Sequence, residues 1–241
     1  MIGFGIDFAG YTTGKTSVAA VEINGRSARA TLLRDSKLSK KRESSEELQQ
    51  VVADDVEALR RCLNVGSVAV DIPIDLQGLP NPKRPKQIWA LTRRPIDKRV
   101  NAMPPFADRI GAPVARFAAI MRESNFFALL GERLFEAYPA ATLRMLEIEA
   151  GGYKGTKNAE ALTRLCNTLK IEPHVENDDD VDAIICAITA AAPMQQVIDA
   201  DAFKIEGPLP RGFRIPKTLT FDNISVSTSG FDEWMTAREA R

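Results

Sequence analysis

The residues best able to do chemistry are acids in otherwise apolar segments. Asp7 lies near the end of the run IGFGIDF, and Asp71 stands inside VAVDIPI, where its neighbours are apolar. A buried aspartate without a partner costs several kcal/mol, so Asp71 needs a partner. Two bare carboxylates a few ångströms apart repel, and a divalent metal ion is the usual way to hold them together. These two acids therefore predict a metal site.

A second pair of acids lies in the run NDDDVD. Asp179 and Asp182 stand three positions apart at the start of a predicted helix, so both side chains share one face and could add ligands. Hard oxygen ligands of this kind suit Mg²⁺ or Mn²⁺. The chemistry they support is in-line displacement at phosphorus, in which metal ions activate water and neutralise the leaving oxygen.

The overall composition argues against several other mechanisms. His174 is the single histidine, which removes most reactions that need a histidine base or several histidine ligands, such as Ser-His-Asp hydrolysis and zinc-protease chemistry. The cysteines number three and are widely spaced, as expected for reduced core residues. Lys plus Arg equals Asp plus Glu, 32 of each, so any binding of nucleic acid must come from local basic patches.

The elements that must position these acids begin with strands. Residues 2–8 read as a buried strand, and the runs 16–23 and 27–33 read as two more, joined by Asn24-Gly25, a strong hairpin signal. A helix with apolar spacing follows and ends near Asn64, and 68–72 is a further buried strand. Three antiparallel strands, a helix and a fourth strand are in the order of the RNase H-like fold. In that order the first and fourth strands are neighbours, which brings Asp7 and Asp71 together.

The rest of the chain adds helices to this core. We expect one RNase H-like α/β domain over residues 1–241, with a mixed five-stranded sheet flanked by helices. A basic, Pro-rich insertion at about 76–113 and a C-terminal extension at about 193–241, a loop or edge strand, would decorate it. The later predicted elements are a helix at 112–130, a short strand at 134–138, a helix at 158–169 and a helix at 179–192.

The basic insertion is a candidate phosphate-binding flap. Its stretch 83–99 carries seven cations against the one acid Asp97, and Trp89 within it could stack on a base. A solvated loop is the other interpretation of the same charges. The cations are Lys83, Arg84, Lys86, Arg93, Arg94, Lys98 and Arg99.

A phosphate-binding loop is the main competing motif. The segment AGYTTGKT satisfies a loose Walker A pattern with Lys15 and Thr16, but a hairpin follows it where a P-loop needs a helix. A turn between two strands explains it better, although Lys15 could still contact a phosphate beside Asp7. Sugar kinases and actin-like ATPases share the strand order but need two such domains. An ASKHA-like phosphotransferase or ATPase and an inactive scaffold protein remain the alternatives.

Several motifs in order resemble a known family. GIDFAG, VAVDIPI, FEAYPAATL, YKGTK and DDDVDAIICAITAA, with IEG after them, are similar to domain of unknown function 429 (DUF429), described as predicted RNase H-like nucleases distantly similar to Holliday-junction resolvases. The resemblance implies metal ligands on the first strand, the fourth strand and the last core helix. It also implies an acid in FEAYPA and phosphate-facing lysines in YKGTK. The implied residues are Asp7, Asp71, Asp179, Asp182, Glu136, Lys154 and Lys157.

Together these features predict a metal-dependent phosphodiesterase, specifically a nuclease acting on DNA or RNA with Mg²⁺ or Mn²⁺. The resolvases usually have Glu on the fourth strand, whereas this chain has Asp71. Endonuclease and exonuclease action both fit, and so do a monomer and a homodimer. Because the chain has no run of about 18 apolar residues and no signal-peptide pattern, we expect no membrane association and a cytoplasmic location.

Overall fold

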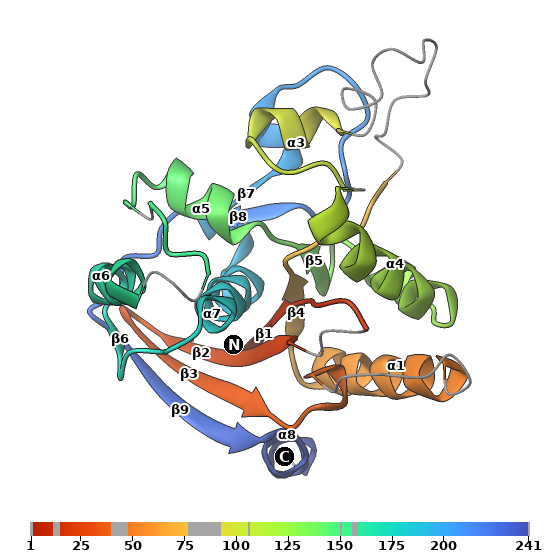
Figure 1. Ribbon diagram of the computed structural model, residues 1–241, viewed down its shortest axis with the longest axis horizontal. Helices are drawn as coiled ribbons and strands as arrows, with labels where there is room; N and C mark the ends of the chain where they lie inside the picture. The colour runs from red at the N-terminus through yellow and green to blue at the C-terminus, as the bar shows by residue number, and fades with distance from the viewer. Residues whose placement is uncertain are drawn as a thin grey trace.

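The computed structural model describes residues 2–11, 15–39, 48–76, 93–105, 107–149, 151–155 and 159–240. Its centre is a mixed seven-stranded sheet in the order β5-β4-β1-β2-β3-β9-β6, beside a two-stranded sheet of β7 and β8 (Figure 1). The strands are β1 Ile2–Asp7, β2 Ser17–Asn24, β3 Ser27–Arg34, β4 Ser67–Val70, β5 Leu134–Glu136, β6 Ile171–Glu172, β7 Val197–Asp199, β8 Arg214–Pro216 and β9 Asn223–Gly230.

Helices cover both faces of the large sheet. The α-helices are α1 Leu48–Val65, α3 Pro95–Arg99, α4 Asp108–Arg122, α5 Pro139–Met145, α6 Ala159–Leu169, α7 Asp178–Ala191 and α8 Phe231–Glu239. Short 3₁₀ turns lie at Lys37–Ser39, Phe126–Leu129, Met194–Gln196 and Ala200–Phe203. Helices α6 and α7 lie on one face of the sheet, and α1, α4 and α8 pack against the other (Figure 1). None of the helices in these described ranges is long and apolar enough to cross a membrane.

The antiparallel β1-β2-β3 unit confirms the predicted start of the fold. Asn24 pairs with Ser27 across the predicted hairpin, and Gly25 adopts a positive φ of 60°, which glycine tolerates without strain. Strand β4 pairs parallel to β1, with Ile6 opposite Val70. This arrangement is consistent with an RNase H-like fold.

The prediction of a five-stranded sheet was wrong, because the described part of the chain forms a sheet of seven strands. The C-terminal segment expected as a loop or edge strand instead contributes β9, which runs parallel to β3 in the interior of the sheet. Strand β6 then pairs with β9 and forms the edge. The sequence NISVSTSG is rich in small polar residues and only partly buried, and β6 has two residues, so neither gives a clear apolar strand signal.

The predicted insertion contains helical structure in its described residues. Its described part, 93–105, contains α3, and α4 begins at Asp108, before the helix predicted from 112. That helix ends at Arg122 and is separated from the 3₁₀ turn Phe126–Leu129, so the run predicted to Leu130 is two elements. Residues 77–92, which include Trp89, and residue 106 lie outside the described residues.

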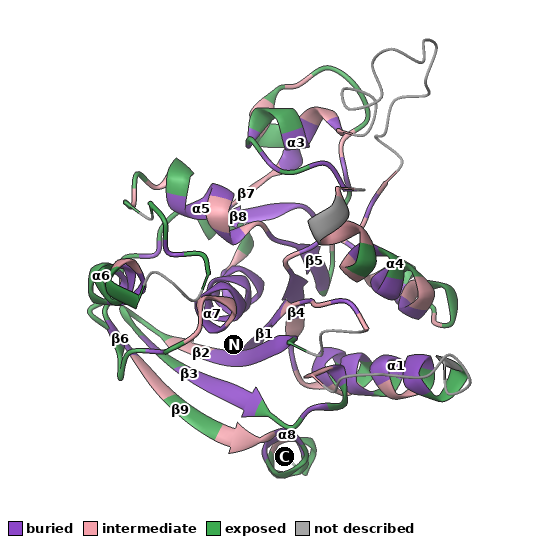
Figure 2. Cartoon of the chain, viewed as in Figure 1, coloured by how far each residue is buried: buried purple, intermediate pink, exposed green. Residues whose placement is uncertain are grey.

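Helix α7 approaches the backbone of β1 closely because β1 carries glycine on that face. A Cβ atom at Gly3 would overlap the carbonyl of Ala187, and one at Gly5 would overlap the carbonyl of Ala183. Most of α7 is buried, as the purple helix in Figure 2 shows. Side chains alternate along a strand, so Asp7 shares the face of Gly3 and Gly5 and points toward α7.

Candidate metal centre

Three acids from three elements meet at the carboxyl ends of β1 and β4. Asp7 ends β1, Asp71 directly follows β4, and Asp182 lies in the second turn of α7. Each offers a carboxylate oxygen, and these oxygens all lie within 4.8 Å of one another. The amide of Asp71 donates to the carbonyl of Ile6 over 2.9 Å, which continues the parallel pairing and holds the two strand ends together. The acids are a possible site for a metal ion.

The three carboxylates repel one another when no metal ion is bound. Burial, and then the charge of Asp71, raise the pKa of Asp7 well above its ordinary value of 3.8. Burial raises the pKa of Asp71 from 3.8 to about 6, with the charge of Lys154 opposing the rise and that of Glu136 adding to it. In both cases the ionised carboxylate is disfavoured, and a divalent ion would relieve this.

Asp182 is fully buried and held from one side. The hydroxyl of Tyr153 donates to its Oδ1 over 2.7 Å. Burial, and then the charges of Asp71 and Asp7, raise the pKa of Tyr153, so the phenol keeps its proton and remains a donor. Among the described residues Oδ2 accepts no regular hydrogen bond, and Nζ of Lys154 lies against it as an ion pair. Oδ2 of Asp182 therefore has the ammonium group of Lys154 as its neighbour.

Lys154 is the cation paired with this carboxylate. Burial alone would lower its pKa, but the charges of Asp71 and Asp7 outweigh burial and raise it, so the ammonium group stays protonated. It neutralises part of the cluster. The second predicted lysine, Lys157, lies outside the described residues.

Asp179, the fourth predicted ligand, lies beside the cluster of three. Burial, and then the charge of Asp178, raise its pKa, and its own charge raises the pKa of Asp7. The next residue, Asp180, is not among the site residues predicted from the sequence. Its carboxylate is buried and accepts from Ser17 at 2.8 Å and from Arg34 at 2.7 and 2.9 Å. These bonds fix the start of α7 on β2 and β3.

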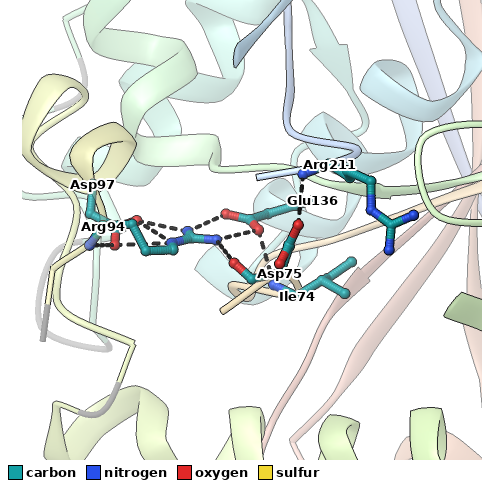
Figure 3. A network of polar contacts seen from close by, with 6 residues as sticks. All are labelled: Ile74, Asp75, Arg94, Asp97, Glu136 and Arg211. Atoms are coloured by element: carbon teal, nitrogen blue, oxygen red, sulfur yellow. Dashed lines mark hydrogen bonds and ion pairs between the residues drawn. The ribbon is translucent and has the colours of Figure 1, made fainter. Parts of the chain in front are cut away.

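Glu136 belongs to a separate buried network (Figure 3). Its Oε2 accepts from the Arg94 guanidinium at 2.8 Å and from the amide of Ile74 at 2.9 Å, and its Oε1 accepts from Arg94. The remaining donors of Arg94 reach Asp97 and the carbonyl of Asp75, so all five N–H groups are engaged. Glu136 is therefore an anchor for the segment after β4, and its charge acts on Asp71 from a distance.

The predicted phosphate contacts are dispersed. Arg94 is 1% exposed with every donor occupied, so burial gives it a structural role instead of the predicted phosphate contact. Arg93 is half-buried beside it. Lys15 is exposed and lines a second cavity of about 720 Å³, which it shares with Asp178 and Asp179. The residue after Thr16 starts β2, so no helix follows as a P-loop requires.

A second buried arginine fixes the loop after β1. The five donors of Arg116 reach Asp55, the carbonyls of Ala9 and Leu38, and Oγ1 of Thr16, at 2.8 to 3.1 Å. Arg116 and Asp55 are both fully buried. In the sequence, Asp55 and Arg116 are charged residues of two amphipathic helices. Nothing in that pattern indicates that they pair inside the core.

The profile of a family described as "Protein of unknown function (DUF429)" matches residues 5–196. The chain belongs to the DUF429 family. No curated protein and no solved structure matched it in the same comparisons. The match to DUF429 covers both strand-end acids, Lys154 and the start of α7, so the three-carboxylate cluster lies entirely within the DUF429 region.

Proposed function

We propose that this protein is a divalent-metal-dependent phosphodiesterase, and specifically a nuclease. The observation that carries the proposal is the meeting of Asp7, Asp71 and Asp182 with their oxygens within 4.8 Å. Carboxylate oxygens are the ligands that Mg²⁺ and Mn²⁺ prefer, and the donor set contains no nitrogen or sulfur atom. The raised pKa values of Asp7 and Asp71 support the same conclusion, since the site gains from a bound cation.

The residues have distinct roles in this proposal. Asp7, Asp71 and Asp182 hold the metal, and Asp179 adds a ligand or orients water from its edge. Bound metal would supply activation of water and neutralisation of the leaving oxygen. Tyr153 orients Asp182 through its 2.7 Å hydrogen bond. Lys154 balances the charge of the acids and would turn toward a substrate phosphate once a metal neutralises them. Lys15 contacts phosphate at the second cavity.

Cleavage assays with matched variants test the proposal. Purified protein is incubated with labelled DNA and RNA in Mn²⁺ or Mg²⁺, with and without chelator. We expect chelator-sensitive cleavage that Asp7→Asn abolishes and Asp201→Asn preserves, since Asp201 is exposed and lies outside the cluster. Cleavage that survives in Asp7→Asn would show a contaminant, and ATP hydrolysis without cleavage of nucleic acid would favour the kinase-like alternative.

A further inference from the structure

A cavity of about 500 Å³ opens beside the acidic cluster. The polar part of its lining includes the charged side chains Asp7, Asp71, Asp178, Asp179 and Lys154. The rest is mainly apolar and partly aromatic. Residues from distant segments form these walls, among them Phe8, Ile72, Val100, Met103, Tyr138 and Phe213.

The size and lining of the cavity suit one small organic group. Pockets that hold such groups typically measure about 300–1,000 Å³ and combine apolar walls with a few placed polar groups. The buried residues Arg94, Asp97 and Glu136 also line the cavity, and the hydrogen bonds among them hold these polar groups in place. A phosphate backbone would instead need a basic groove, and the cavity's cations are already paired with acids.

We propose that this cavity binds a single nucleobase, so that the enzyme acts on one nucleotide unit whose phosphate reaches the acidic cluster. The unit is a small nucleotide ester or a nucleotide displaced from a strand, as in enzymes that bind an extruded base. Aromatic walls suit a base, because every base has a face that stacks. Among the described residues Oε1 of Glu136 accepts one hydrogen bond, from Arg94, so it can accept another from a base amino group.

This assignment rests on the proposed function for its chemistry. With the base in the cavity, a water oxygen forms the new bond to phosphorus, the bond from phosphorus to the leaving sugar oxygen breaks, and a proton from the water passes to that oxygen. Base binding itself needs no turnover. It can therefore be measured separately from cleavage.

The test compares ligands that differ only in the base. The full chain is titrated by calorimetry with AMP, CMP and ribose 5-phosphate in Ca²⁺. We expect the nucleotides to bind about 10-fold or more tightly than ribose 5-phosphate, in line with the free energy of stacking one base. Equal affinity for ribose 5-phosphate would refute the base site, even where nucleic acid is cleaved.

Two variants and one control locate the site. Ala140 lines the cavity from α5 and is half-buried, so Ala140→Trp should fill the space and remove the gain from the base. Ala118 is exposed on α4 and is not part of the lining, so Ala118→Trp should keep the gain. Met103→Ala, at a side chain 40% exposed, should reduce the gain several-fold and decides the matter if Ala140→Trp does not fold. An unchanged gain in both cavity variants would place base binding elsewhere and overturn the assignment.

The two proposals fail in different ways. Manganese titration followed by electron paramagnetic resonance should give the same affinity for Ala140→Trp as for the wild type, since Ala140 is outside the carboxylate cluster. If the protein binds nucleotides through the base but neither binds Mn²⁺ nor cleaves any phosphodiester, the base site is supported and the proposed function is refuted.

Discussion

Replacing Asp71 with asparagine should stabilise the metal-free protein at high pH. The pKa of Asp71 rises from 3.8 to about 6 on folding, a difference of about 2.2. At about 1.36 kcal/mol for each pH unit, keeping this carboxylate ionised costs the folded state about 3 kcal/mol at pH 8. An asparagine side chain carries no such charge. The free energy of unfolding of Asp71→Asn should therefore exceed that of the wild type by up to about 3 kcal/mol at pH 8.

The sign of the pH dependence follows from the same rise in pKa. Between about pH 4 and pH 6 the folded state holds the proton of Asp71 more tightly than the unfolded state does, so this group's contribution to stability falls as pH rises. The difference between Asp71→Asn and the wild type should be about 3 kcal/mol at pH 8 and roughly half of that at pH 5. Carboxylates outside the cluster cancel in the difference, whereas Asp7 loses the repulsion of Asp71 in the variant, which adds to the stabilisation at pH 8.

Urea unfolding at pH 5 and pH 8 in chelator measures this difference, with Asp201→Asn as the control for losing one exposed charge. Adding Mn²⁺ should reverse the order at pH 8, because only the wild type keeps all three carboxylates. A variant that is less stable than the wild type at pH 8, or a difference that does not change with pH, would refute the view that Asp71 is a strained acid.

Three further substitutions test the surroundings of the cluster. Lys154→Met should lower the melting temperature of the metal-free protein at pH 8 more than at pH 5, since its acidic partners lose charge at low pH; equal losses by thermal unfolding would contradict this pairing. Gly5→Ala should lower the free energy of unfolding by at least about 1–3 kcal/mol and weaken Mn²⁺ binding, because the added methyl group displaces α7. Unchanged Mn²⁺ binding by calorimetry would argue against that packing. Arg94→Met should lower the free energy of unfolding, measured with urea, by about 3–5 kcal/mol, because it leaves the charges of Asp97 and Glu136 unpaired. An unchanged free energy of unfolding would contradict the buried hydrogen-bond network of these three residues.

The sequence predicts the first half of the fold well because local signals there are strong. Asn24-Gly25 specifies a hairpin, and the continuous apolar run around Asp71 specifies a buried strand. Strand β9 has no comparable signal, since its Ser and Thr residues pair through the backbone with β3 and its side chains are only partly buried. Its place in the sheet depends on the tertiary partner rather than on local pattern.

The candidate site was predictable in its acids but not in its cations. An aspartate in an apolar strand indicates a need for a partner, and strand order brings Asp7 to Asp71. The sequence does not indicate in the same way which residues an arginine pairs with, because an arginine on the surface and one in the core can have similar neighbours along the chain. Arg94 was accordingly predicted to face phosphate, although it is enclosed by acids. One signal was overlooked: the alternation Gly3, Gly5, Asp7 indicates a helix packed on the face that carries the acid.

The buried arginines explain why the three acids stay close despite their repulsion. Arg116 ties the loop after β1 to α1 and α4, and Arg94 ties the segment after β4 to β5 and α3. The contact of α7 with bare glycine backbone fixes Asp182 in turn. Because these contacts hold all three segments in place, the acids cannot reduce their repulsion by moving apart. The repulsion therefore lowers the free energy of unfolding of the metal-free protein. A divalent ion would then meet a preorganised site, and its binding free energy would include the release of that repulsion.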